Sequence, residues 1–422
     1  MEMNRSNQLC LLFAAVMTLG LFACNRDVYD PDKHKEIVKY ASPVDSVDQN
    51  HMWQLAQSHA YTFSANAGVG AERLEVFNGN PLESTTAEML GRFYIEDGQQ
   101  LSAAVSVPAL TETLYAALVD GDGKYTVTSF RATDKSVDFS SPLATKQAPR
   151  FTKPSVLAYT YCFEDEFPQP GDYDYNDVVM RLGIERTGRK QVTLHVTLAA
   201  VGSFNQIAGA VRLVGYRFQD IDSVTVSGDK FNDGVSAIPH SMIDSEEPLV
   251  EGRRNEAVVN LFVDAHWALS DDHNVEYSNI TRKKINVLRS YTDQYDVIFA
   301  KSADYTIYFK NEKDLNFLTH EMIDPFILTP YSASTFEIHL EEFKAAQVFY
   351  EYPTVSFKDL PWALKIPTRS FRYPQEGEQI GFKKDGYMFG AYMSAGHSFG
   401  EWAEDHNNYL DWYLYPLERL VW

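Results

Sequence analysis

The clearest strand pattern in the chain is Val192-Thr193-Leu194-His195-Val196-Thr197-Leu198. Apolar and polar residues alternate strictly along it, and a strand with this period buries one face and exposes the other to water. Helical periodicity is scarce, with one candidate short helix at 342–348. Similar alternating patterns lie between turn residues at 60–64, 124–130, 211–218 and 257–263. We therefore predict a mainly β protein with two β-sandwich-like antiparallel domains in tandem and few short helices.

The composition favours a globular protein that repels nucleic acid. The chain has 422 residues, of which 45% are hydrophobic and 14% aromatic, enough to build a sizeable core. Its 37 basic and 58 acidic residues give a formal net charge of −21. Such a surface repels phosphate backbones and anionic lipid headgroups, so we expect no nucleic-acid partner and regard divalent cations as the more natural ligands.

The N-terminus has the features of an export signal. Arg5 precedes an apolar run at 9–22, which has signal-peptide length and is too short to span a bilayer comfortably. Leu21-Phe22-Ala23-Cys24 follows and resembles the lipobox of bacterial lipoproteins. We therefore expect residues 1–23 to be a lipoprotein signal peptide and Cys24 to carry covalent diacylglycerol and palmitate. A conventional signal peptide that is cut elsewhere is the alternative.

The segment after the lipidated cysteine predicts where the protein lies. Residues 24–49 are polar and acid-rich, which is typical of a tether, and acidic residues at this place resemble the surface-export signals of Bacteroidota lipoproteins. No later stretch approaches 18 consecutive apolar residues, so the lipid would be the membrane attachment. We expect a cell-envelope lipoprotein of the outer membrane, displayed on the cell surface. With Cys24 lipidated, Cys162 has no intrachain partner for a disulfide.

Two β regions follow the tether. We predict an N-terminal β-sandwich-like domain at 50–150 and a larger β-rich domain at 155–422, joined by a polar connector at 142–154. Asp120-Gly121-Asp122-Gly123 could be a metal loop, but Asp-Gly pairs supply the backbone of a hairpin turn, which we favour. His195 stands on the polar face of its strand, where we expect an ordinary exposed residue and not a ligand.

The most informative stretch for function is Phe163 to Val179. Seven oxygen-bearing side chains lie within 14 residues there, divided by the turn Pro168-Gln169-Pro170-Gly171. So many carboxylates are costly to bring together without a cation, and Ca²⁺ prefers six to eight oxygen ligands. We therefore predict a structural calcium site, and a solvated acidic loop is the alternative. The predicted ligands are Glu164, Asp165, Asp172, Asp174, Asn176 and Asp177, with Glu166 as the seventh acidic or amide side chain of the cluster.

The spacing within this stretch excludes an EF-hand. Asp172, Asp174 and Asn176 match its first three ligand positions, but Asp177 replaces the required glycine and Gly183 the final glutamate. The alternation suits an extended segment or a tight loop, with the acids on one side and Tyr173 and Tyr175 on the other. We expect the two tyrosines to pack while the acids coordinate.

These motifs resemble a known family. Phe163-Glu164-Asp165, Pro168-x-x-Gly171-Asp172 and Tyr175-Asn176-Asp177-Val178-Val179 are similar to the entry motif of the LruC-type domain, a domain of unknown function common in Bacteroidota lipoproteins. His339-Leu340-Glu341 departs from the family's His-Leu-Pro. The resemblance implies a β-rich envelope lipoprotein and no established activity. Further segments that fit it in order are 209–215, 260–266, 324–326, 361–364 and 411–413.

Two motifs suggest an enzyme, but their context favours structural roles. Gly396-His397-Ser398-Phe399-Gly400 matches the G-x-S-x-G nucleophile elbow, yet the chain lacks the alternating βαβ pattern that builds a hydrolase sheet. His320-Glu321-Met322-Ile323-Asp324 falls short of the zinc motif H-E-x-x-H, and we expect a turn there. We therefore expect no catalytic residues and no enzyme activity.

Aromatic residues are dense from Trp362 to Tyr415, where they could form a β core or stack on carbohydrate, and we favour the core. Our main hypothesis is a non-enzymatic lipoprotein that acts as a calcium-stabilised binding, adhesion or structural module, with a surface glycan or a protein as partner. The alternative is a glycan-binding or glycoside-hydrolysing surface protein, whose catalytic carboxylates would flank an open cleft. A third possibility is a fibre subunit with an uncovered edge strand.

Overall fold

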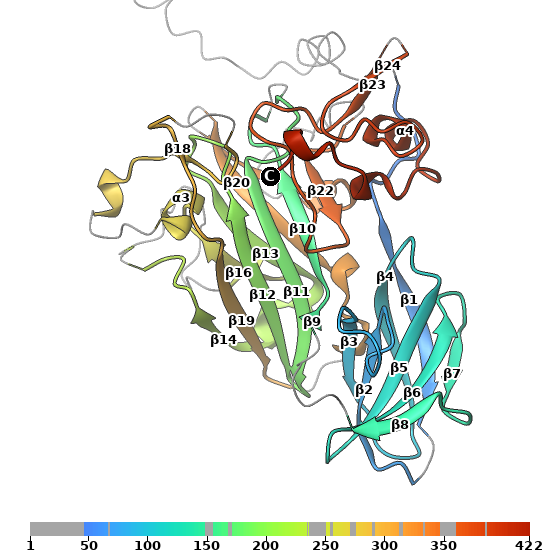
Figure 1. Ribbon diagram of the computed structural model, residues 1–422. Coiled ribbons are helices and arrows are strands. Elements are labelled where there is room, and N and C mark those ends of the chain that lie inside the picture. The colour runs from blue at the N-terminus through green and yellow to red at the C-terminus, as the bar shows by residue number, and fades with distance from the viewer. Residues whose placement is uncertain are drawn as a thin grey trace, which may run out of the picture.

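The structure is a computed structural model dominated by two β-sandwiches (Figure 1). The predicted fold class, mainly β with antiparallel sheets and few short helices, is confirmed. Among the described residues, no helix is long and apolar enough to cross a membrane. The structure describes residues 46–65, 68–147, 155–167, 171–233, 235, 250–253, 256–270, 276–288, 292–311, 315–331, 334–346, 360–384 and 386–422.

The first sandwich consists of a three-stranded and a six-stranded sheet. In the smaller sheet, β1 (Ala56–Ser64) lies between β4 (Gln100–Pro108), antiparallel to it, and β7 (Ser136–Asp138), parallel to it. Phe63, Leu74 and Leu118 are fully buried between the two sheets. The order of the larger sheet is β8 (Ala144–Gln147), β6 (Lys124–Arg131), β5 (Thr113–Asp120), β2 (Ala71–Phe77), β3 (Glu88–Tyr94) and β9 (Ser155–Val156).

In this region the sequence predicts the turn at 120–123 correctly, but not the strand in the connector at 142–154. Asp120-Gly121-Asp122-Gly123 is the predicted hairpin turn between β5 and β6, and the Asp120 carboxylate accepts hydrogen bonds from the backbone N–H groups of Asp122 and Lys124. The segment predicted as a polar connector instead contributes the edge strand β8. Short exposed edge strands carry little hydrophobic signal, which explains the difference.

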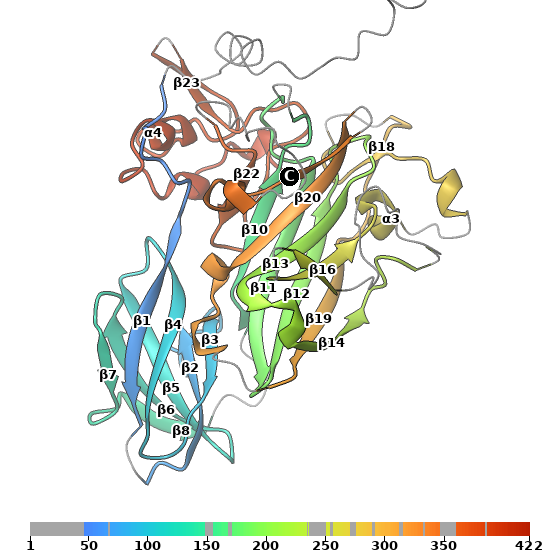
Figure 2. The ribbon, with the colours of Figure 1, turned by 180° about the vertical axis from the view of Figure 1, so that it is seen from behind.

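The second sandwich contains a six-stranded and a five-stranded sheet that pack face to face (Figures 1 and 2). The order of the six-stranded sheet is β14 (Ile221–Gly228), β19 (Lys301–Phe309), β12 (Gln191–Ala200), β11 (Val178–Gly188), β10 (Ala158–Phe163) and β22 (Ala363–Ile366). The order of the five-stranded sheet is β15 (Val250–Arg253), β16 (Glu256–Phe262), β13 (Ala208–Arg217), β20 (Ile323–Tyr331) and β21 (Ser334–Ile338).

Strand β12 shows why the alternating sequence forms this sheet. Its Val192, Leu194, Val196 and Leu198 side chains are buried in the core between the two sheets. The intervening polar residues stand on the outer face of the six-stranded sheet, so period-two alternation fixes which side of the strand faces the core.

The remaining elements are short. The pairs β17 (Lys284–Ile285) with β18 (Tyr295–Asp296) and β23 (Phe382–Lys384) with β24 (Tyr387–Phe389) form two small ribbons. The helix predicted at 342–348 is the 3₁₀ helix η5 (Glu341–Ala346), within the part of that segment that the structure describes. The other helices within the described ranges are α3 (Ala265–Leu269), α4 (Phe399–Glu404), η1 (Phe218–Asp220), η2 (Tyr277–Asn279), η3 (Leu315–Phe317), η4 (His320–Met322), η6 (Trp412–Leu414) and η7 (Glu418–Leu420).

The C-terminal segment 367–422 folds over one end of the second sandwich, beside the start of the described chain (Figure 1). The rings of Trp53 and Trp402 pack edge to face with their centroids 5.3 Å apart. The backbone N–H of Asp48 donates a hydrogen bond to the carbonyl of Ala403. Most aromatic residues of this segment are buried, including Tyr373, Tyr392, Trp402 and Trp412, so the predicted core role is confirmed for them.

The two sandwiches are connected through buried polar contacts. Arg92 on β3 pairs with Glu75 in the first sandwich and with Glu185 on β11 in the second. The hydroxyl groups of Ser106 on β4 and Tyr159 on β10 lie 2.7 Å apart. Ser106, Tyr159 and both glutamates are buried and the Arg92 side chain is 15% exposed, so the junction is a defined interface and not a loose linkage.

Candidate metal centre

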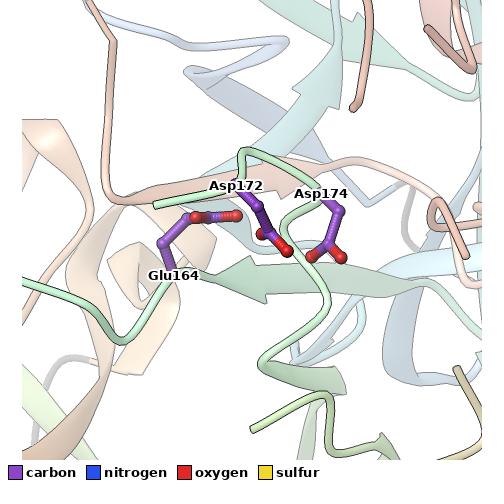
Figure 3. A group of neighbouring side chains, drawn as sticks. All are labelled: Glu164, Asp172 and Asp174. Atoms are coloured by element: carbon purple, nitrogen blue, oxygen red, sulfur yellow. The ribbon is translucent and has the colours of Figure 1, made fainter. Parts of the chain in front are cut away.

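The acidic stretch forms the connection between β10 and β11, at the end of the second sandwich that the C-terminal segment covers. Figure 3 shows the carboxylates of Glu164, Asp172 and Asp174 turned toward one another. Oxygens of these three groups lie within 4.8 Å of each other. A second group, Glu164, Glu166 and Asp177, satisfies the same distance limit, so Glu164 belongs to both.

Burial distinguishes this loop from an ordinary acidic surface. Glu164, Asp174 and Asp177 are 2%, 1% and 4% exposed, whereas Asp172 lies at the exposed edge. The alternative of a solvated acidic loop is therefore wrong for most of its acids. Buried carboxylates need compensation by hydrogen bonds, cations or protons.

Backbone hydrogen bonds shape the loop around Glu164. The N–H groups of Tyr173 and Tyr175 donate to its two carboxylate oxygens, at 3.2 and 2.6 Å. Both tyrosines have positive φ, 61° and 52°, a left-handed conformation that bulky residues rarely adopt. The loop is thus tightly coiled and not extended. The prediction that the tyrosines pack is confirmed, because Tyr173 and Tyr175 are 4% and 0% exposed.

Two glycines leave room for the carboxyl and amide groups. A Cβ atom on Gly171 would lie 2.0 Å from Oε2 of Glu164, and one on Gly202 would lie 1.7 Å from Oδ1 of Asn176. Both distances are far below van der Waals contact, so a side chain at Gly171 would push the Glu164 carboxylate aside. One at Gly202 would also meet the backbone oxygen of Asn176, which lies 2.8 Å from the added Cβ. Gly202 is a part of the site that the local sequence around 163–179 does not reveal.

Asp165 and Asn176 lie outside the two carboxylate groups. Asp165 accepts hydrogen bonds from the hydroxyl of Ser203 and the amide of Asn205, at 2.5 and 2.8 Å. The amide nitrogen of Asn176 donates to the carbonyl of Pro374, and its oxygen Oδ1, in a fully buried side chain, has no hydrogen-bond partner among the described residues. Of the six predicted ligands, the structure therefore brings Glu164, Asp172, Asp174 and Asp177 together, adds Glu166, and gives Asp165 protein partners instead.

The pKa values of these acids reflect their confinement. Burial, and then the neighbouring carboxylates Glu166 and Asp172, raise the pKa of Glu164 well above its usual range. Burial likewise raises the pKa values of Asp174 and Asp177 well above normal, and that of Glu166 to about 7. The cluster therefore disfavours its own ionised form, and a bound cation would reverse this effect.

One lysine from a distant strand approaches the cluster. Lys284 on β17 pairs with Glu376. Burial lowers the pKa of Lys284, but the carboxylates of Glu376, Asp177 and Asp172 outweigh this effect and raise it. Asp174 accepts a hydrogen bond from the backbone N–H of Gly377, at 2.7 Å. These partners come from segments more than 100 residues away along the chain, for which the local motif gives no signal.

The motifs that suggest an enzyme have structural roles in the fold. Ser398 is 1% exposed and caps α4: its hydroxyl accepts from the backbone N–H of Glu401, whose side chain accepts from the Ser398 backbone in return. The spacing Ser-x-x-Glu is a capping-box signature that the sequence itself contains. His320 lies in η4, the predicted turn, where its ring stacks on Tyr159 at 3.9 Å.

The predicted lipidation site lies outside the described residues. Cys24, the signal peptide 1–23 and most of the tether 24–49 precede Ser46, the first residue that the structure describes. Cys162 is free and buried on β10, and burial raises its pKa far above the normal thiol value, as expected for an inert core residue.

The fold and the buried carboxylate loop define a class of protein: a mainly β chain of two sandwiches with a candidate cation site at one end. The chain belongs to a family described as a domain of unknown function, DUF4842, whose model matches residues 190–413, from β12 to η6. The match begins after the acidic loop, and the LruC name is not confirmed by it. No curated protein matches the chain.

The fold is similar to that of a solved structure. It is the crystal structure, at 2.08 Å resolution, of a Bacteroides ovatus protein whose name makes it a candidate lipoprotein. The two chains align with a TM-score of 0.50 and 15% sequence identity, over 83% of this chain and 99% of the other. At this identity the similarity shows a shared fold alone.

Proposed function

We propose that this protein is a lipid-anchored component of the bacterial cell envelope whose second sandwich is stabilised by Ca²⁺, and that it acts as a non-enzymatic binding, adhesion or structural module. The observation that supports this proposal is the pair of buried carboxylate groups that share Glu164. Lipidation and calcium binding are independent properties, and each has its own experiment.

Charge favours a divalent cation over a lysine as the species that neutralises the ionised cluster. Five carboxylates form the two groups, and Lys284, whose charge interacts with Asp177 and Asp172, is already paired with Glu376. Ca²⁺ prefers carboxylate oxygens as ligands, and its coordination shell tolerates irregular geometry. Glu164, Asp172 and Asp174 would hold such an ion, with Asp172 at the accessible side.

Calorimetric titration of EDTA-treated full-length protein with CaCl₂ tests this site. We expect saturable heat and a rise in melting temperature, because an ion that binds only the folded state stabilises it by mass action. Asp172→Asn should weaken binding at least tenfold. Asp122→Asn, which removes a carboxylate from the exposed β5–β6 turn, is the matched control and should bind as the wild type does. Absence of both heat and stabilisation would overturn the calcium proposal.

The lipid anchor has an independent test. Cells that express the chain should incorporate labelled palmitate into it, and Cys24→Ser should abolish the label and release the protein from membranes, whereas Cys162→Ser should do neither. Protease treatment of intact cells would then show whether the lipidated protein is on the outer surface. Palmitate on the Cys24→Ser chain would contradict the assignment, whatever the calcium result.

The alternative of a glycan-active protein receives little support from the C-terminal aromatics. Trp402 and Trp412 are fully buried, and Tyr392 with them, so these rings are not available to stack on sugar. The formal net charge of −21 repels nucleic acid, so we propose a glycan or a protein as the partner.

A further inference from the structure

A groove crosses the outer face of the six-stranded sheet of the second sandwich, beside its junction with the first sandwich. Figure 1 views the molecule from this side, with β10, β11, β12 and β19 in front. The groove has a volume of about 470 Å³, within the range of small-molecule sites. Gly183 on β11 has no side chain to fill it, and Arg369, after β22, lines it as well.

A chain of ion pairs organises the floor of this groove. His195 on β12 lies between two carboxylates, with Nδ1 at 2.7 Å from Asp304 on β19 and Nε2 at 3.0 Å from Glu185 on β11. These hydrogen bonds, that to Glu185 first, raise the pKa of His195. The prediction of an ordinary exposed histidine is therefore wrong, because the side chain is 30% exposed and bridges neighbouring strands.

Among the charged side chains that line the groove, Arg181 on β11 is the one that has no ion-pair partner among the described residues. Glu185 has Arg92 and His195, Asp304 has His195, and Arg369 has Glu88. Arg181, in contrast, makes no hydrogen bond or ion pair with any residue that the structure describes, and its buried Nε atom has no acceptor there. In a chain with 58 acidic and 37 basic residues, a half-buried arginine without an acceptor indicates space for an anionic group.

The rest of the lining indicates what else the ligand carries. Thr197 and Ser302 stand next to Arg181 across the sheet, with their hydroxyl oxygens 2.7 Å apart. The carboxylate of Asp304 is 47% exposed and can accept hydrogen bonds from hydroxyl groups of a ligand. Among the described lining residues, His195 has the only ring, so charge and hydrogen bonds, not stacking, would select the ligand.

We propose that this groove binds a sugar acid, a small polyol with one carboxylate, in which Arg181 pairs with the carboxylate and Asp304 accepts from the hydroxyl groups. A dicarboxylate would be repelled by Asp304 and Glu185, and a neutral sugar would leave Arg181 without its acceptor. A planar guanidinium matches a carboxylate with two parallel hydrogen bonds. None of the residues that line the groove belongs to the loop 164–177, so this proposal is separate from the calcium proposal.

Ligand-observed NMR titration of the full-length protein in EDTA tests the proposal. Glucuronate is the probe, and glucose is the matched neutral sugar, since the two differ only at the carboxylate carbon. We expect glucuronate to bind at least tenfold more tightly than glucose. Arg181→Gln should weaken glucuronate at least tenfold, Arg181→Lys should weaken it less, and Arg131→Gln, on the exposed end of β6, should leave it unchanged.

Several outcomes would overturn the proposal. Equal binding of glucose, undiminished binding by a folded Arg181→Gln variant, or no binding of glucuronate, galacturonate or N-acetylneuraminate would each do so. Tight binding of glycine or of inorganic sulfate without any sugar acid would show that the groove recognises a zwitterion or a bare oxyanion instead. Thr197→Val supplies a second variant that keeps the charge; it should weaken glucuronate several-fold while leaving the melting temperature close to that of the wild type.

Discussion

The buried side chain of His339 makes the stability of the fold depend on pH. Its imidazole is buried after β21, with Nδ1 at 2.8 Å from Asp324 and Nε2 at 3.3 Å from Glu337. Burial lowers the pKa of such a group, but the two carboxylates, Asp324 first, outweigh it and raise the pKa of His339 from 6.5 to about 9. The folded state therefore retains a proton that the unfolded state loses between these two values.

The sign and size of the effect on stability follow from this difference. Because the unfolded chain binds fewer protons in this interval, the stabilisation is complete below pH 6.5 and is lost as the pH rises through about 9. One pKa unit corresponds to about 1.4 kcal/mol, so the total is about 3 kcal/mol. Without the charge of His339, Arg212 would be the only cation paired with Asp324 among the described residues.

Urea unfolding followed by tryptophan fluorescence at pH 6, 7, 8, 9 and 10 measures this stabilisation. The free energy of unfolding of the wild type should fall by about 3 kcal/mol more across this range than that of His339→Gln, and the two curves should converge at the alkaline end. His397→Gln is the control, since His397 is 40% exposed in its pair with Asp411 and such an exposed pair contributes little to stability. Parallel pH curves for the wild type and His339→Gln would refute the reasoning.

Two further predictions concern the junction and the capping box. Arg92→Met should destabilise the protein by about 3 to 5 kcal/mol, because the buried carboxylates of Glu75 and Glu185, each 1% exposed, lose the cation that they share. Calorimetry should then resolve two transitions. Arg189→Met, in an exposed pair with Glu96, should cost less than about 1 kcal/mol. A single unshifted transition in Arg92→Met would contradict this role of the junction. Ser398→Ala should cost about 1 kcal/mol through loss of the α4 cap, measurable as a lower melting temperature, and an unchanged value would show that the cap contributes nothing.

The long strands could be predicted from the sequence because their signal is local. Alternation along 192–198 assigns both the strand and its buried face, and the turn at 120–123 has residues that favour its backbone. The short edge strands β8 and β9 could not be predicted, since two to four residues carry no periodicity. Their pairing depends on sheets that already exist.

The candidate site was predictable only in its local part. The acids of 164–177 are visible in the sequence, but Gly202, Lys284 and Gly377 approach them through the fold. The left-handed backbone of Tyr173 and Tyr175 has no signal in residue type, because tyrosine does not favour positive φ. His195 illustrates the same limit, since its partners Glu185 and Asp304 lie on neighbouring strands that no local pattern pairs with it.

The contact of Asp48 and Trp53 with the C-terminal segment has a mechanical consequence. A pull on the chain ahead of Ser46 reaches the hydrogen bond from Asp48 to Ala403 and the packing of Trp53 on Trp402 before it reaches β1. A force applied through the tether would thus act on the C-terminal segment of the second sandwich first, and the first sandwich would bear little of it. Such a pull would therefore load the C-terminal segment before it loads the first sandwich.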